Sequence, residues 1–382
     1  MSALAPLRRA QGLRVAVVHD WLTGMRGGER VLEAICELLP QAELFTLLHV
    51  PGSVSATIER RPIRTSLLQR VPLARRTYRY WLPIFPILVE QFDLDGFDLV
   101  VSSSHCAAKA AVAPGRARHL CYCHSPMRYA WDQFDAYFGE ARAGRVGTAA
   151  LKVMMRRLRR WDAATAARVD RFVANSRHVA ERIRRYYNRH AGIVYPPVDT
   201  AFFRPDGRAP GGYFLVVSAL VPYKRLDLAI AACRALRAPL KIVGRGPERA
   251  RLERIAGPEV EFLGSRTNEE VRELYRGAAA VVLPGEEDFG IVPVEALACG
   301  RPVVALRRGG AAETVEDGVT GVLVDEPSPE AFADALARVR RLAVDPQLYA
   351  ARAARFSRER FAQAFGAEVE RLLDAPEGGR RW

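Results

Sequence analysis

Short apolar runs alternate with amphipathic stretches along the first half of the chain. The runs that predict strands are Val15–His19, Leu44–Leu48, Leu99–Ser102, His119–Cys123 and Asp170–Asn175. Gly28–Leu39 has apolar residues on one side, and Ser176–Tyr186 follows the last strand, so both stretches predict helices. Strands that alternate with helices indicate a doubly wound, parallel α/β sheet.

The second half repeats this alternation. It predicts strands at Tyr213–Ser218, Leu240–Val243, Val260–Leu263, Ala279–Leu283, Val303–Ala305 and Gly321–Val324, with helices at Leu226–Leu236 and Glu248–Ile255. Between the halves, Val194–Val198 is rich in proline and reads as an extended linker. We therefore predict two Rossmann-like domains facing a cleft, comprising residues 1–195 and residues 196–359.

The composition fits a folded protein without a membrane span. The chain has 382 residues, of which 49% are hydrophobic and 26% charged. No apolar run reaches the ~18 residues that a spanning helix needs, and no signal peptide is expected at the N-terminus. The six cysteines form no disulfide framework and fit a reducing cytosol.

Positive charge is concentrated in the first half, which points to an anionic partner. Residues 1–195 hold 30 lysines and arginines against 16 acidic residues, whereas residues 196–382 hold 27 of each. Basic residues alternate with apolar ones between Arg60 and Phe85 and between Leu151 and Trp161, a pattern typical of segments on an anionic membrane surface. The alternative is an arginine-rich solvated surface. No nucleic-acid-binding motif positions the charge, so a nucleic acid is not expected.

Glu287 and Glu295 are the most informative residues. Glu287 follows the Ala278–Pro284 run, and Glu295 falls in the early part of a predicted helix from Val294 to Cys299. The carboxyl ends of parallel strands are where ligands bind. Gly290 allows close backbone approach, and a helix start offers N–H groups to phosphate. Two carboxylates around such a site suit a nucleotide sugar, although helix capping is the alternative.

Other candidates follow predicted strands in the same way. Gly27 and Gly28 open a helix after the first strand, Lys224 and Arg225 follow the first strand of the second half, and His124 follows His119–Cys123. A cation in such a loop stabilises the charge of a departing diphosphate. For each of these positions, an ordinary turn, a solvated cation or a buried histidine is the alternative.

A metal site is not expected. The thiols of Cys121 and Cys123 lie on one face of a strand and favour packing over zinc binding, and Asp93-Leu-Asp95 reads as a loop that enters a strand. Gly244-Arg-Gly246 lacks the third glycine of a dinucleotide fingerprint and is better interpreted as a loop near a nucleotide.

Five motifs in this order resemble the retaining family 4 glycosyltransferases of GT-B fold. They are Arg14–Asp20, Gly27–Arg30, the HSPMRYAWD segment His124–Asp132, the SALVPYKR segment Ser218–Arg225 and the EDFGIVPVE segment Glu287–Glu295. The resemblance implies that a final helix within Ala351–Leu373 crosses back, so that residues from about 360 to 382 join the first domain. The HSPMRYAWD and LVPYKR wording resembles the O-antigen mannosyltransferase branch, whose donor is GDP-mannose.

The resemblance implies roles for individual residues. Glu287, His124 and Lys224 are the implied catalytic residues. The implied donor-binding residues are Gly27, Gly28, Lys224, Arg225, Gly244, Gly264, Phe289, Gly290, Ile291 and Glu295. Arg128 and Asp132 are candidates for the acceptor side. The family usually has an arginine where this chain has Ala219, so a neighbouring cation must replace it or phosphate binding is weakened.

The resulting expectation is a retaining, metal-independent hexosyltransferase without a cofactor. It would move mannose from GDP-mannose to a lipid-linked oligosaccharide or polysaccharide precursor, as a cytoplasmic protein peripheral on the inner face of the cell membrane. Three alternatives remain: a UDP-sugar donor, a non-catalytic member of a glycan assembly complex, and a nucleotide-sugar epimerase.

Overall fold

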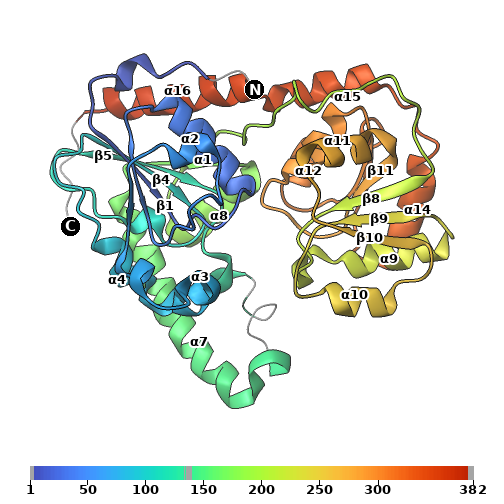
Figure 1. Ribbon diagram of the computed structural model, residues 1–382, viewed down its shortest axis with the longest axis horizontal. Helices are drawn as coiled ribbons and strands as arrows, with labels where there is room; N and C mark the ends of the chain where they lie inside the picture. Colours follow the sequence, from blue (N-terminus) through green and yellow to red (C-terminus); the bar gives the residue numbers. More distant parts are fainter. Residues whose placement is uncertain (1–3, 133, 135–139, 377–382) are drawn as a thin grey trace. The chain divides into compact units, whose positions relative to one another are not determined.

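The computed structural model describes residues 4–132, 134 and 140–376, and these form two compact units (Figure 1). The first unit comprises the chain up to Pro197 together with the segment from Glu359 onward, and the second comprises Val198–Arg358. The chain therefore passes between the units twice. Both units are parallel α/β structures, which confirms the predicted fold class.

The first unit contains a seven-stranded sheet in the order β3-β2-β1-β4-β5-β6-β7. All its strand pairs are parallel. Its strands are β1 Val15–His19, β2 Glu43–Thr46, β3 Ile63–Thr65, β4 Leu99–Ser104, β5 Arg118–Cys123, β6 Arg171–Ala174 and β7 Ala191–Ile193. The sequence did not predict β3 and β7, because each has three residues and neither is an apolar run.

Two apolar cores cover the two faces of this sheet, because successive side chains of a strand point to opposite faces. Val15 and Val17 belong to one core, and Ala16 and Val18 to the other. Helices α1 and α16 lie on one side of the sheet and α4 and α7 on the other (Figure 1). The helices are α1 Gly27–Leu38, α2 Ala56–Glu59, α3 Ala74–Thr77, α4 Phe85–Glu90, α5 Arg128–Trp131, α7 Glu140–Ala164 and α8 Arg177–Tyr187.

The second unit contains a six-stranded parallel sheet in the order β10-β9-β8-β11-β12-β13. Its strands are β8 Tyr213–Val217, β9 Leu240–Val243, β10 Val260–Gly264, β11 Ala278–Leu283, β12 Val303–Leu306 and β13 Gly321–Val324. Its helices are α9 Leu226–Ala235, α10 Arg249–Ile255, α11 Asn268–Gly277, α12 Ile291–Ala298, α13 Ala311–Thr314, α14 Pro329–Val339 and α15 Pro346–Ala353. All six predicted strands are present.

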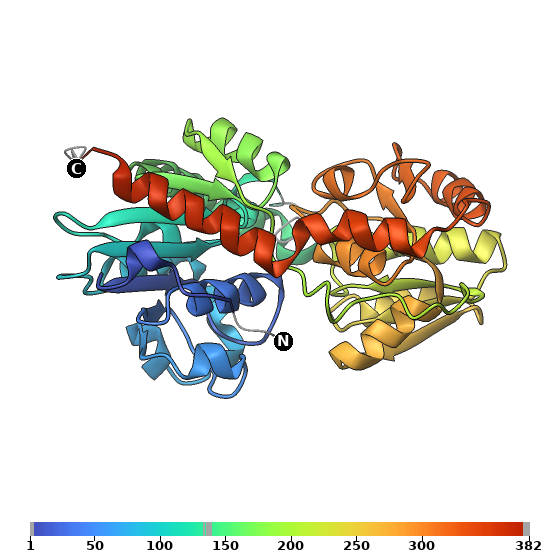
Figure 2. The ribbon, with the colours of Figure 1, turned by 90° about the horizontal axis from the view of Figure 1, so that it is seen from above.

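The last helical segment is interrupted, so the predicted final helix occupies only part of the range Ala351–Leu373. Helix α15 ends at Ala353, a 3-10 turn covers Ala354–Phe356, and α16 spans Arg358–Asp374. The interruption falls where the chain leaves the second unit. Figure 2 shows α16 running along the first unit, where Phe361 and Phe365 join its core.

The described part of the chain contains no helix with the length and apolarity needed to cross a membrane. The six cysteines are all buried and form no disulfide.

A charged pair is buried under α7. Lys109 is 1% exposed, and its Nζ lies 3.1 Å from Asp162 Oδ1 and donates to Thr165 Oγ1 at 3.0 Å. Asp162 Oδ2 accepts hydrogen bonds from Trp131 Nε1 at 2.7 Å and from Tyr187 Oη at 2.9 Å. The pair thus ties α7 to its neighbours.

Replacing Lys109 with methionine should destabilise the first unit by about 3–5 kcal/mol, because a buried carboxylate loses its counter-charge. Thermal unfolding of Lys109→Met measures this loss. Lys152→Met is the matched control, since Lys152 is exposed, and its effect should stay within about 0.5 kcal/mol. Equal melting temperatures for the two variants would contradict the prediction.

Candidate active site

Strand order places the candidate residues at one edge of each sheet. The order reverses between β1 and β4 in the first unit and between β8 and β11 in the second. In open parallel sheets, ligands bind at the carboxyl ends of the strands beside such a reversal. Lys224 follows β8 and Glu287 follows β11, so both lie at the reversal of the second sheet.

Lys224 and Glu287 form an ion pair. Lys224 Nζ contacts Glu287 Oε1, and the two side chains are 13% and 17% exposed. Lys224 Nζ also lies 5.0 Å from the centre of the Tyr223 ring. The structure therefore brings together two residues predicted to act on one ligand, in a partly desolvated environment where their attraction exceeds that of a surface pair.

Glycines let the loops around this pair approach closely. A Cβ atom on Gly285 would lie 2.7 Å from Lys224 Cα, and one on Gly310 would lie 2.2 Å from Phe289 Cα. Gly310 N donates to Glu287 O at 2.8 Å. Any side chain at these glycines would separate the loops, so the positions of Lys224 and Glu287 depend on them.

Glu295 is buried inside α12 rather than near its start. The helix begins at Ile291, three residues before the predicted Val294, because Gly290 with φ +82° ends the preceding loop. Glu295 is 6% exposed, and its Oε2 accepts a hydrogen bond from Tyr275 Oη at 2.9 Å. Sequence reasoning missed Tyr275, which lies twenty residues earlier on α11. The implied role of Glu295 in donor binding stays a prediction.

The remaining donor-side residues fall into two groups. Gly244, Gly264 and Gly290 have positive φ angles in loops or at a strand end. Arg225 also has a positive φ, of 49°, and its Nη2 donates to Asp227 Oδ2 at 3.1 Å.

Phe289 and Ile291 differ from each other in burial. Phe289 is buried with its ring 5.5 Å from that of Phe356, so its side chain faces the core. Ile291 is half-buried at the first position of α12.

Ala219 lies opposite Arg245 in the adjacent loop. Leu220 N donates to Arg245 O at 3.0 Å. Cβ atoms on Gly244 and Gly246 would come within 1.8 Å of Ser218 O and 2.2 Å of Leu220 O, so the two loops touch on both sides of these residues. Arg245 is exposed, and a cation is therefore available beside the position where the resembled family carries an arginine.

In the first unit, a hydrogen-bonded row of side chains crosses the end of the sheet. Ser103 Oγ lies 2.9 Å from His124 Nε2 and 3.1 Å from His19 Nδ1. His19 is fully buried, and burial lowers its pKa to about 3, so it is neutral at physiological pH. His124 is half-buried, and its ring lies 3.8 Å from a Cβ built on Gly28. The structure thus places predicted His124 and Gly28 together.

Asp20 is a structural residue that sequence reasoning missed. Its carboxylate is fully buried and accepts four backbone N–H bonds, from His105, Cys106, Ala107 and Ala108, at 2.6–3.0 Å. It fixes the turn that follows β4. The sequence feature that could have identified Asp20 was its position directly after β1.

The acceptor-side candidates lie beside α5. Arg128 begins this helix and is half-buried. The Asp132 carboxylate accepts from Arg182 Nη2 and Tyr186 Oη, both on α8. Gly27 and Gly28 are the first residues of α1. The acceptor-side roles of Arg128 and Asp132 stay predictions.

No group of three or more His, Cys, Asp or Glu side chains among the described residues is placed to hold a metal ion. Asp95 N donates to Asp93 Oδ1 at 3.1 Å, so the Asp93-Leu-Asp95 segment forms a local turn.

Two family models match consecutive parts of the chain. Residues 25–202 match Glycosyltransferase Family 4, and residues 200–355 match Glycosyl transferases group 1. Among curated relatives, D-inositol 3-phosphate glycosyltransferase of Mycolicibacterium gilvum is 32% identical over 205 residues, which are 47% of this chain and 46% of the relative. The enzyme of the same name from Saccharomonospora viridis is 34% identical over 243 residues, 54% of this chain and 55% of the relative. The chain spans about half the length of these relatives.

Solved structures share the fold over nearly the whole chain. Anabaena HepE (Alr3699) in complex with UDP superposes with a TM-score of 0.69 at 18% identity, covering 94% of this chain and 100% of HepE. Sucrose-phosphate synthase of Thermosynechococcus elongatus superposes with a TM-score of 0.72 at 19% identity, covering 95% of this chain and 100% of that protein. The chain therefore has the GT-B fold, and its two matched regions are similar to Glycosyltransferase Family 4 and to Glycosyl transferases group 1.

Proposed function

We propose that the chain transfers a hexosyl group from a nucleoside diphosphate sugar, with retention of configuration and without a metal ion. The Lys224–Glu287 pair, at the strand-order reversal of the second sheet, carries this proposal. The pair supplies a cation that can bind a diphosphate and a carboxylate that can accept hydrogen bonds from sugar hydroxyls. Both residues lie in loops whose close contact depends on glycines.

The chemistry follows from the charges. As the bond from the anomeric carbon to the diphosphate breaks, negative charge grows on the phosphate oxygens, and a cation already in place stabilises it. Lys224 supplies that cation. Glu287, once Lys224 binds phosphate, accepts hydrogen bonds from sugar hydroxyls. The acceptor hydroxyl passes its proton to the departing phosphate on the same face of the sugar, which retains configuration. Arg225 and Glu295 assist by binding the diphosphate and the ribose.

The proposed role of His124 is the contact with the transferred sugar that the resemblance implies. Its Nε2 lies 2.9 Å from Ser103 Oγ, which fixes the orientation of the ring. Neutral His19 holds the other side of the Ser103 hydroxyl.

GDP-mannose is the donor we propose, because the HSPMRYAWD and LVPYKR segments resemble mannosyltransferases. A UDP-hexose is the second candidate. It is favoured by the HepE structures, one of which holds UDP and another UDP-glucose. The acceptor we propose is a lipid-linked oligosaccharide or polysaccharide precursor.

Calorimetric titration with GDP, UDP, GDP-mannose and UDP-glucose in EDTA tests the donor. We expect binding of GDP and GDP-mannose alone. In a transfer assay, Lys224→Ala should lose about 2–4 kcal/mol of transition-state stabilisation. Lys241→Ala is the matched control, because Lys241 pairs with Glu261 away from the loop edge, and it should transfer normally. Binding of uridine compounds alone would select the second candidate. Failure of all four ligands would overturn the donor site.

Arg245 should compensate for Ala219. Since its backbone lies against the Ala219 loop, Arg245→Gln should weaken GDP binding roughly tenfold, the loss of one charge-assisted hydrogen bond. Adding Ala219→Arg to this variant should restore binding. The control is Arg249→Gln, whose guanidinium pairs with Glu253 on α10. Unchanged affinity in Arg245→Gln would contradict the role.

We further propose that the first unit rests on the inner face of the cell membrane. Between Glu59 and Glu90 the sequence holds seven arginines and no acidic residue. Leu73 and Tyr80 are 69% and 85% exposed, and exposed arginines lie between them. This segment and α7 pack on the same core. Exposed apolar groups among cations favour an anionic lipid surface.

The double substitution Leu73→Ser with Tyr80→Ser should reduce binding to vesicles of equimolar phosphatidylglycerol and phosphatidylcholine more than about tenfold, because each side chain loses apolar burial in lipid. Sedimentation with vesicles measures it. The control replaces Ile255 and Val319, exposed apolar residues of the second unit, with serine. Equal vesicle binding by both variants and the unchanged chain would argue against the membrane contact.

A further inference from the structure

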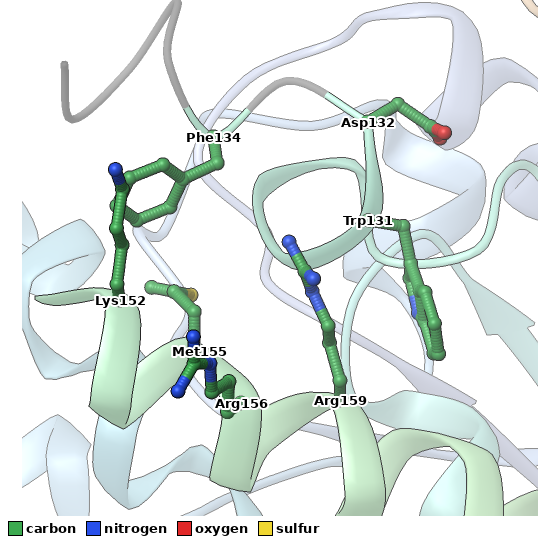
Figure 3. Close-up of a pocket in the computed structure, with 7 residues that line it drawn as sticks. All are labelled: Trp131, Asp132, Phe134, Lys152, Met155, Arg156 and Arg159. Carbon is green, nitrogen blue, oxygen red and sulfur yellow. The ribbon is translucent and has the colours of Figure 1, made fainter.

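A cavity of about 390 Å³ lies between helix α7 and the residues Trp131, Asp132 and Phe134. It is lined by Trp131, Asp132, Phe134, Lys152, Met155, Arg156 and Arg159 (Figure 3). Three of these residues are cations and one is an acid. The predicted interfacial stretch from Leu151 to Trp161 therefore does more than present a flat basic surface.

Helix α7 carries three stripes at helical spacing. Leu151, Met155 and Leu158 pack against the core of the first unit. Lys152, Arg156 and Arg159 form the next stripe and line the cavity. Val153, Arg157 and Arg160 form a third stripe and are exposed. Because the first stripe anchors the helix, the second stripe is held toward the cavity.

The cavity has an excess of positive charge. The Asp132 carboxylate is already paired with Arg182, and in Figure 3 it points away from Lys152. Arg159 Nε donates to Ala130 O. Among the described residues, Lys152 and Arg156 have no ion pair or hydrogen bond. The Lys152 ammonium and the Arg156 guanidinium are therefore available to bind an anion, and Arg159 lines the same cavity.

The side chains that line the cavity limit the kind of molecule whose anionic group can bind there. Phe134 and Met155 are buried and apolar. The Trp131 ring is stacked on Tyr186 at 4.5 Å and has the Arg159 guanidinium 5.9 Å from its centre, so its faces are covered against a sugar. A doubly charged phosphate group matches the cations, since phosphate accepts from both arginine and lysine. An apolar chain matches Phe134 and Met155.

We propose that this cavity binds the phosphate or diphosphate group of a prenyl-type amphiphile. The assignment deepens the proposed function, on which it rests for the link to transfer: the amphiphile is the carrier of the lipid-linked acceptor. The anion site itself is argued only from Lys152, Arg156 and the cavity, and it does not depend on the proposed function.

Calorimetry with inorganic diphosphate and with farnesyl diphosphate tests the proposal in the full chain. Farnesyl diphosphate should bind, and at least about tenfold more tightly than inorganic diphosphate, because the chain adds apolar contact. The variant Lys152→Gln with Arg156→Gln should lose roughly tenfold or more of this affinity. Arg157→Gln with Arg160→Gln removes the same charge from the outward stripe and should stay within about twofold.

Three results would overturn the proposal that the cavity binds a prenyl-type phosphate. Equal losses in the two variants would mean a diffuse charged surface, and equal affinity for the two ligands would mean a free phosphate site. A loss confined to vesicles of equimolar phosphatidylglycerol and phosphatidylcholine would assign the cations to bulk lipid. GDP titration of both variants is the control for folding. Absence of nucleotide binding in the unchanged chain would overturn the donor proposal alone, because the cavity result does not involve that site.

Discussion

Backbone contact between neighbouring loops sets the geometry at the edge of the second sheet. The loops after β9, β8, β11 and β12 touch one another through Gly244, Gly285 and Gly310, where even a methyl group would overlap backbone atoms. Side chains that leave these loops have little freedom of position. Lys224 and Glu287 are held together by this arrangement and by their own charge, so the site is organised before a ligand arrives.

The two units differ in their balance of positive and negative charge. The second unit has a net charge of only +1, from 23 lysines and arginines and 22 acidic residues, and many of its arginines pair within a few residues, as Arg249 does with Glu253. The first unit holds 13 of the 14 excess positive charges, and seven of the nine large apolar side chains that are exposed among the described residues belong to it. A protein that handles a soluble anionic donor on one unit and a surface-bound partner on the other would divide its charges in this way.

The fold could be predicted from the sequence wherever buried strands are long enough to form apolar runs. All six strands of the second sheet were found, but β3 and β7 were missed because three residues leave no pattern. The start of α12 was misplaced because Gly290, interpreted only as a position of close backbone approach, is also the helix N-cap.

The candidate site was predicted as a set of residues but not as a set of contacts. Lys224 and Glu287 were assigned to different parts of a ligand, and only the fold brings their heads together. Tyr275, Ser103 and Asp20 were missed, since partners far apart in sequence leave no local signal. The α7 cations were seen as one basic stretch, because their division into stripes depends on which face meets the core.

The return of the chain to the first unit has a consequence for biosynthesis. Phe361, Phe365 and Val369 complete one core of that unit, and Glu368 pairs with Arg171 of β6. During translation, the first 197 residues leave the ribosome without these groups, while the second unit already has its whole sequence at Arg358. The second unit can therefore finish folding first, and the N-terminal part must wait, partly assembled and within reach of chaperones, for the last helix to emerge.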